Sequence, residues 1–233
     1  MELLYDYIEY FGFVTGVLYL VFEIKQMKLM WLVGILSALA YIVIFAGSSL
    51  YAAMGLQVYY LGVSIYGWLE WRRGEKVLAA MKRGQKEAAG GKRSGKEDVN
   101  KLKKNDIAEE GAGPAGIFYR VPTRKTILWS TACFLVIFGL LLTVLRNLTG
   151  DPMPVADAAA TALSVIATYW LSRSFRAQWL IWIAVNILTV LLCVTQQLYV
   201  TSGLYIIYVI FAVYGYFHWG RKGTLLREDN KLL

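Results

Sequence analysis

Charged residues are scarce in this chain of 233 residues. Asp, Glu, Lys and Arg make up 17% of it, against about 25% in a typical soluble domain. Hydrophobic residues make up 58%, and they gather in blocks close to the ~20 residues with which a helix crosses the hydrocarbon core of a membrane. The shortage of charge excludes an ordinary soluble domain and predicts an all-α membrane protein.

Motifs for catalysis and for nucleotide binding are also missing. The chain has no GxxxxGK[ST] loop for ATP and no Ser/His, Cys/His or paired-carboxylate constellation within the apolar blocks. Its two cysteines, Cys133 and Cys193, lie inside apolar blocks without the spacing of metal ligands, so we interpret them as small apolar residues. We therefore expect no enzyme activity, no cofactor and no bound metal.

Acidic side chains are absent from the middle of the apolar blocks. Glu23, Glu70 and Asp157 lie at or near block ends. A carrier coupled to protons or sodium ions usually places carboxylates inside the membrane, where they are costly and therefore tend to be functional. The sequence thus favours facilitated diffusion over ion-coupled transport.

Each apolar block is expected to form one transmembrane helix. The acidic start, MELLYDYIEY, has neither the basic region nor the small-residue cleavage site of a signal peptide, so the first block is expected to stay in the protein. The seven blocks cover residues 8–24, 29–47, 51–71, 125–146, 155–172, 179–196 and 202–219.

Basic residues predict the orientation of these helices. If the N-terminus is outside, every lysine and arginine except Arg146 lies in a segment that faces the cytoplasm or at the helix end beside it. Because such residues are enriched in cytoplasmic loops, we expect the N-terminus outside and the C-terminus inside. The net charge of +8 then reflects topology and contact with anionic lipid heads of the bilayer, and no nucleic-acid partner is expected.

Two short stretches far apart in the chain have the same pattern. Residues 66–73 read YGWLEWRR and residues 214–221 read YGYFHWGR, 148 positions apart. The same shift gives 12 identities over the 43 positions 31–73, and five of these are Tyr or Trp rather than the Leu, Ile or Val that chance similarity would favour. We therefore predict an internal duplication. The identical pairs are Trp31/Trp179, Leu32/Leu180, Ile35/Ile183, Leu50/Leu198, Tyr51/Tyr199, Gly55/Gly203, Leu56/Leu204, Tyr60/Tyr208, Tyr66/Tyr214, Gly67/Gly215, Trp71/Trp219 and Arg73/Arg221.

The predicted repeat unit is three helices, and three is an odd number. A second triplet joined directly to the first would enter the membrane inverted, so the single helix between them returns the chain to the starting side. This predicts a 3+1+3 arrangement of parallel repeats, with a substrate site near the midplane between the two halves. The expected parts are a first three-helix bundle (1–74), a linker (75–124), the connecting helix (125–146), a second three-helix bundle (155–219) and a tail (220–233).

The predicted linker differs in composition from the rest of the chain. Residues 75–116 are rich in Gly, Lys and Glu and contain no aromatic residue. Such a segment cannot bury enough apolar surface to offset its chain entropy. We predict that residues 75–124 are a mostly disordered cytoplasmic tether, with a short helix near residues 98–110.

Polar and aromatic side chains within the blocks fall on single helical faces and are the candidate site. Trp179, Trp182 and Asn186 share one stripe, and Gln57, Tyr60 and Ser64 share another. The residues 148 positions after the Gln57 stripe are Tyr205, Tyr208 and Ala212. The residues 148 positions before the Trp179 stripe are Trp31, Gly34 and Ala38. Ser37, Ser164 and Thr168 are further candidates on similar grounds.

These candidates also have structural interpretations. Trp and Tyr of membrane helices gather at the two interfaces, and Trp179 lies close enough to a block end to belong there. Asn186 and Gln57 could instead hydrogen-bond between helices, and both readings stay open. An interfacial position is expected for Trp68, Trp71, Trp129, Trp170 and Trp219.

Three long runs resemble the PnuC-type vitamin transporters, a family best known for nicotinamide riboside. The resemblance covers nearly all the membrane part and is carried by an LQ…IYGW signature and by a WxxWxxxN signature. The runs are LYAAMGLQVYYLGVSIYGWLEW (50–71), TALSVIATYWLSRSFRAQWLIWIAVNILTV (161–190) and GLYIIYVIFAVYGYFHW (203–219).

The resemblance implies a 3+1+3 fold like that of SWEET sugar transporters, a bacterial inner-membrane location, and uptake by facilitated diffusion followed by trapping through a cytoplasmic kinase. It implies substrate contacts at Trp179, Trp182, Asn186, Gln57 and Tyr60. Some members of the family are trimers, so it also implies a homotrimer.

Two positions depart from the family pattern. The family often has Glu where this chain has Gln178, and often has Asn where Ser37 stands. These differences leave open which vitamin is carried. Relatives of the same fold carry thiamine and others riboflavin, so thiamine, or another B vitamin, is the alternative substrate to nicotinamide riboside. Thiamine and nicotinamide riboside both have a flat cationic ring, which Trp and Tyr faces bind through cation–π contact. A membrane scaffold that acts through its linker is the alternative from another class.

Overall fold

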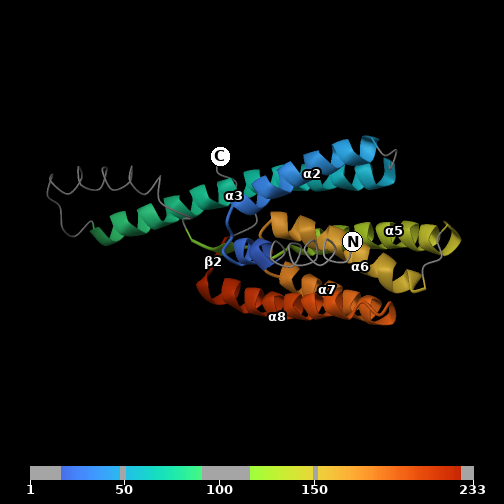
Figure 1. The fold of residues 1–233 in the computed structure, drawn as a ribbon. Coiled ribbons are helices and arrows are strands. Elements are labelled where there is room, and N and C mark those ends of the chain that lie inside the picture. The colour runs from blue at the N-terminus through green and yellow to red at the C-terminus, as the bar shows by residue number, and fades with distance from the viewer. Residues whose placement is uncertain (1–16, 48–50, 91–115, 149–151, 227–233) are drawn as a thin grey trace.

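The computed structural model describes residues 17–47, 51–90, 116–148 and 152–226 (Figure 1). Apart from two short strands, the regular structure in these residues is helical, which confirms the all-α class. Residues 17–24 form the first described helix. It is followed by α2 (Leu29–Gly47), α3 (Tyr51–Gly90), β1 (Phe118–Tyr119), α5 (Arg124–Leu148), α6 (Pro154–Ser172), α7 (Gln178–Thr195), α8 (Tyr199–Lys222) and β2 (Thr224–Leu225).

Four of the described helices are long and apolar enough to cross a membrane by length and composition. They are α5, α6, α7 and the part of α8 from Thr201 to Lys222. The apolar stretch of α2, Leu29–Ala40, is shorter. In α3, four tyrosines and Gln57 interrupt the apolar part expected to span, which lowers its hydropathy. Most of the expected first block, residues 8–24, lies outside the described residues.

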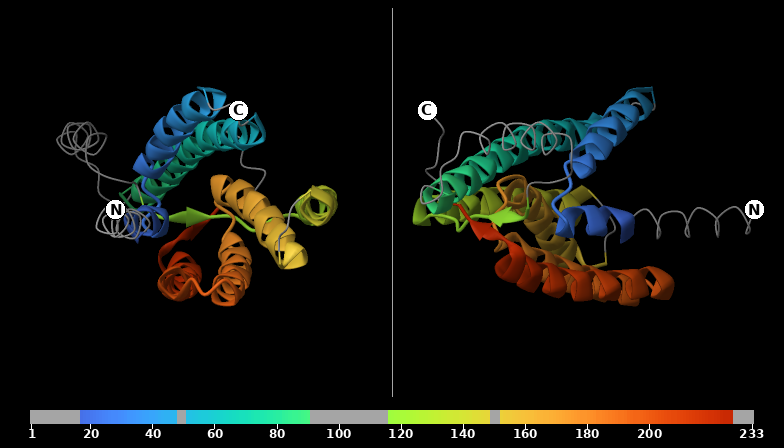
Figure 2. Two further views of the ribbon diagram at one scale, coloured as in Figure 1. Left: turned by 45° about the vertical axis from the view of Figure 1, so that its right-hand side comes forward. Right: turned by 90° about the vertical axis from the view of Figure 1, so that its left-hand side faces the viewer.

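The helices form two pairs joined by a central helix (Figures 1 and 2). In one pair α2 lies along α3, and in the other α7 lies along α8. Helix α6 contacts both α3 and α7, and α5 packs on α6. Helix α5 exposes large apolar side chains along its length, with 73% of Trp129 and 65% of Leu140 accessible, as expected for a surface covered by lipid or by another apolar partner.

Two loops 148 positions apart have the same backbone geometry. Gln26 and Ser174 both adopt the left-handed conformation, with φ of 55° and 57°. Gln26 N donates to Glu23 O over 3.0 Å, and Ser174 N donates to Leu171 O over 2.9 Å. The next residue of each loop donates to the carbonyl five positions earlier, over 2.8 and 3.0 Å, which completes a Schellman cap in each case. We call the end of the bundle that carries these loops the Gln26 end.

A line of four buried tryptophans runs across the Gln26 end. Their ring centroids are 5.3 Å apart for Trp31 and Trp71, 6.5 Å for Trp71 and Trp219, and 5.5 Å for Trp219 and Trp179. No more than 1% of any of these side chains is exposed. The edge-to-face contacts of Trp71 and Trp219 place both rings in the protein core rather than on a lipid-facing surface. Their position at the depth of a membrane interface stays a prediction.

The outer two tryptophans of this line each need a glycine beside them. A Cβ on Gly67 would lie 2.6 Å from the Trp31 ring, and a Cβ on Gly215 would lie 2.7 Å from the Trp179 ring. The inner two tryptophans join the halves of the chain: Trp71 Nε1 donates to Leu171 O, and Trp219 Nε1 donates to Ile24 O. The shift of 148 thus relates the two tryptophan–glycine contacts as well as the two loops.

The ends of the predicted linker are ordered, which corrects the expectation of disorder over residues 75–124. Helix α3 continues to Gly90, and its Val77 and Leu78 are buried in the same apolar cluster as Phe118. Strand β1 pairs in parallel with β2 near the C-terminus. These few apolar side chains find partners from distant parts of the chain, which composition alone does not reveal. The short helix expected near residues 98–110 lies outside the described residues.

Candidate functional site

The three residues of the α7 stripe lie in different surroundings. Trp179 is completely buried, with its ring against Gly215 and its edge toward Trp219, so it belongs to the tryptophan line. Trp182, one turn further along α7, is half-buried, and its Nε1 has no hydrogen-bond partner among the described residues. Asn186 is 6% exposed. The stripe therefore continues from the aromatic core into a polar position.

The position equivalent to Trp182 in the first half is Gly34, where there is little room for a side chain. A Cβ on Gly34 would lie 2.8 Å from Ser64 Oγ, so Ser64 occupies the space that a side chain would need. In the second half the position equivalent to Ser64 is Ala212, which is buried. At these two positions one half thus has a large indole and a buried alanine, and the other half has a glycine and a hydroxyl beside it.

The tyrosines of the candidate site form two ring pairs. Tyr60 packs beside Tyr59 on α3, and Tyr205 packs beside Tyr208 on α8, with centroids 5.5 Å apart in both pairs. The Tyr59 hydroxyl donates to Val165 O over 2.8 Å and so ties α3 to α6. All four rings are partly exposed, which leaves surface available to a ligand.

The remaining candidates are placed less uniformly. Ser164 and Thr168 donate their hydroxyl protons to carbonyls of their own helix, Ala160 and Ser164, over 2.8 Å. Gln57 is half-buried on α3, and Ser37 is exposed on α2. Apart from Ser37, the candidates divide into a group on α3 and α6 and a group on α7 and α8, and α6 contacts both α3 and α7.

A buried carboxyl escaped the sequence analysis. Glu23, expected near a helix end, is 3% exposed and accepts a hydrogen bond from Gln178 Nε2 over 3.2 Å. Gln178 is completely buried, and its Oε1 has no partner among the described residues. One feature of the sequence could have indicated that Gln178 belongs to this site. Gln178 lies one turn before Trp182 on α7, and residues four apart lie on the same side of a helix.

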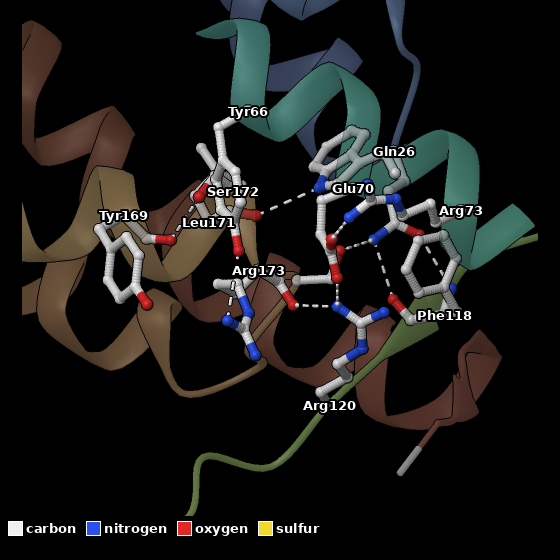
Figure 3. Close-up of polar contacts among 12 residues, drawn as sticks. Gln26, Tyr66, Glu70, Arg73, Phe118, Arg120, Tyr169, Leu171, Ser172 and Arg173 are labelled. Carbon is white, nitrogen blue, oxygen red and sulfur yellow. Dashed lines mark hydrogen bonds and ion pairs between the residues drawn. The ribbon is translucent and has the colours of Figure 1, made fainter. Parts of the chain in front are cut away.

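A second polar group joins the halves at the Gln26 end (Figure 3). Arg120, which is 5% exposed, forms an ion pair of 2.5 Å with Glu70 and also donates to Arg173 O. Its backbone N donates to Ser174 O over 2.9 Å. Arg120 was assigned to the linker by composition, and nothing in the surrounding sequence indicates that it is buried.

Gln26 fastens the same segment from the other side. Its Oε1 accepts from Phe118 N over 2.8 Å, and its Nε2 donates to Phe118 O over 2.9 Å and to Ser174 Oγ over 3.2 Å (Figure 3). Residues 117–120 therefore cross the Gln26 end between the two loops. Across residues 17–47, 51–90, 116–148 and 152–226, no cluster of three His, Cys, Asp or Glu side chains could hold a metal ion.

Comparisons with known proteins agree on one family. A family model described as nicotinamide mononucleotide transporter matches residues 6–221. The nicotinamide riboside transporter PnuC of Escherichia coli (strain K12) is 25% identical over 221 residues, which are 92% of this chain and 85% of the relative. The PnuC of Neisseria mucosa is 31% identical over 78 residues, 30% of this chain and 29% of the relative.

A solved structure shows the same fold. The crystal structure of a vitamin B3 transporter, PnuC, superposes with a TM-score of 0.57 over 93% of this chain and 81% of that one, at 22% sequence identity.

Proposed function

Because the chain belongs to the nicotinamide mononucleotide transporter family, and is therefore a multi-pass membrane transport protein, we propose that it takes up nicotinamide riboside. Uptake occurs by facilitated diffusion across the bacterial inner membrane, and a cytoplasmic kinase traps the product. The observation that carries the proposal is the α7 stripe, in which Trp182 and Asn186 stand one turn apart beyond the buried Trp179.

The chemistry of the candidate residues suits this substrate. Nicotinamide riboside has a flat pyridinium ring, a carboxamide and a ribose. The Trp182 face would attract the cationic ring by about 2 kcal/mol when both are desolvated. Asn186, Gln57 and Ser64 would hydrogen-bond the carboxamide or the ribose, since an unpaired buried donor costs roughly 1–3 kcal/mol. Tyr60, Tyr205 and Tyr208 add aromatic surface.

The proposed architecture is a 3+1+3 arrangement of parallel repeats with the N-terminus outside and the C-terminus inside. The matching loops at Gln26 and Ser174 and the matching tryptophan–glycine contacts support two repeats related by the shift of 148. In this orientation the Gln26 end is cytoplasmic. The homotrimer implied by the family resemblance remains a prediction, for which the apolar face of α5 offers surface.

Titration calorimetry of the purified protein in detergent tests the substrate. We expect nicotinamide riboside to bind in the absence of any ion gradient, with thiamine as the competing ligand. Counterflow in proteoliposomes without a kinase or ATP then tests the mechanism, and labelled substrate should exchange without either. Binding of thiamine but not of nicotinamide riboside would replace the proposed substrate, and a requirement for a proton or sodium gradient would replace facilitated diffusion.

A further inference from the structure

We infer that Glu23 is the group that selects a cationic substrate over a neutral one of the same shape. The inference rests on the proposed function and names the residue that supplies charge specificity. Glu23 lies at the end of the helix formed by residues 17–24 and reaches α7, where its carboxyl meets Gln178. Only 3% of the residue is exposed.

The Glu23 carboxyl has no basic partner among the described residues. Glu70 pairs with Arg120 and with Arg73, and Glu75 pairs with Lys28. Glu23, by contrast, is bonded to a neutral amide, Gln178 Nε2, and to no basic side chain within the part of the chain that the structure describes. A buried carboxyl without a basic partner is costly in its ionised form and tends to hold a proton. A cationic ligand placed beside it would favour the ionised form and would gain an ion pair that a neutral ligand cannot make.

Two buried side-chain atoms on the same helix, one of them on Gln178 itself, have no hydrogen-bond partner among the described residues. Gln178 Oε1 is an acceptor without a donor, and Trp182 Nε1 is a donor without an acceptor. The two side chains are one turn apart on α7. A pyridinium with a carboxamide offers a positive ring, an N–H donor and a C=O acceptor, which complement the carboxylate and these two atoms.

The internal repeat argues against a purely structural role for this carboxyl. The position equivalent to Glu23 in the second half is Leu171, which is buried. Leu171 O accepts from Ser174 N just as Glu23 O accepts from Gln26 N, so the same cap forms with an apolar side chain. The turn therefore does not require a carboxylate at this position.

The test compares nicotinamide riboside with its neutral dihydropyridine form, which has nearly the same shape and no ring charge. Affinities are measured by calorimetry on the purified full chain. The wild type is expected to prefer the cation. In Glu23→Gln, which keeps the size and the hydrogen bond to Gln178, we expect the cation to bind at least about tenfold more weakly and the neutral form to be unchanged.

Glu75→Gln is the matched control, because it removes a carboxylate from an ion pair with the partly exposed Lys28 and should leave both affinities unchanged. If Glu23→Gln does not purify as a monodisperse protein, Glu23→Leu copies the residue of the second half and should show the same loss of preference. Equal affinity of the wild type for the two forms, or an unchanged preference in the variants, overturns the inference. Failure of the wild type to bind nicotinamide riboside or thiamine would instead overturn the proposed function.

Discussion

Gln26 and Ser174 stand 148 positions apart in the chain, share the left-handed backbone conformation and touch each other, with Gln26 Nε2 donating to Ser174 Oγ over 3.2 Å. Each ends a helix with the same cap and precedes a helix whose first turn contains a tryptophan, Trp31 in α2 and Trp179 in α7. Equivalent loops therefore meet where the two halves join. The contacts at this junction lead to the first predictions.

The tryptophan–glycine contacts should be sensitive to a single added methyl group. Gly67→Ala and Gly215→Ala would each place a Cβ within 2.7 Å of an indole ring. We expect each substitution to lower the free energy of unfolding by about 1–3 kcal/mol, because overpacked sites force side chains or backbone to move. Thermal unfolding in detergent measures the change.

Gly62→Ala is the control on the same helix as Gly67, since an added Cβ there meets nothing within 4 Å. Alanine is the better helix former, so this variant should be as stable as the wild type or slightly more stable. An equal loss in Gly62→Ala and Gly67→Ala would contradict the steric explanation.

The Arg120–Glu70 pair should stabilise the junction more than the exposed ion pair beside it. Arg120→Met leaves the mostly buried Glu70 carboxylate without its close partner, and we expect a loss of roughly 3–5 kcal/mol. The side chain of Arg73, the other partner of Glu70, is 72% exposed. Arg73→Met should therefore lower the free energy of unfolding by less than about 1 kcal/mol. Comparable losses in the two variants would show that the buried pair has no special role.

Trp179 and Trp182 should differ in what their removal affects. Trp179→Ala empties a completely buried site and should cost about 3–5 kcal/mol of stability. Trp182→Ala and Asn186→Ala should weaken binding of nicotinamide riboside while the detergent-purified protein stays folded. Calorimetry and size-exclusion chromatography separate the two effects. Unchanged affinity in both binding variants would remove these residues from the site.

The turn after α7 should gain stability from glycine. Gln197 has φ of 60° and caps α7 through its N–H to Val194 O. Gln197→Gly relieves the left-handed backbone and should raise the free energy of unfolding by about 0.5–1 kcal/mol. Gln196→Gly, where φ is −93°, should instead lower it. A loss of stability in Gln197→Gly would mean that its side chain contributes more than the backbone strain costs.

Much of the helical framework follows from local features of the chain. The scarcity of charge and the length of the apolar blocks predicted helices whose bounds agree with the structure within a few residues from α5 to α8. The repeated Tyr, Trp and Gly predicted equivalent positions that share hydrogen bonds and ring contacts. The sequence alone reveals such features, because the length of an apolar block and the identity of a residue do not depend on which distant segments come together.

Interpretation of single side chains was less secure. Trp179 and Trp182 have the same side chain and lie one turn apart, yet Trp179 is buried in the core and Trp182 is partly accessible. Arg120 lies beside a segment whose composition predicts disorder, and Glu23 lies at the end of an apolar block. Both are buried, because each reaches a partner from another part of the chain: Glu70 for Arg120 and Gln178 for Glu23.

By itself the sequence determined the membrane environment, the helices and the equivalence of positions 148 apart, since these depend on composition, length and repetition. Only the tertiary structure decided which tryptophans form the core, that residues 117–120 cross between the halves, and that Glu23 is buried with no basic partner among the described residues. These outcomes depend on contacts between residues far apart in the chain, and the energy of such contacts is set by the packing of the helices rather than by the residues alone.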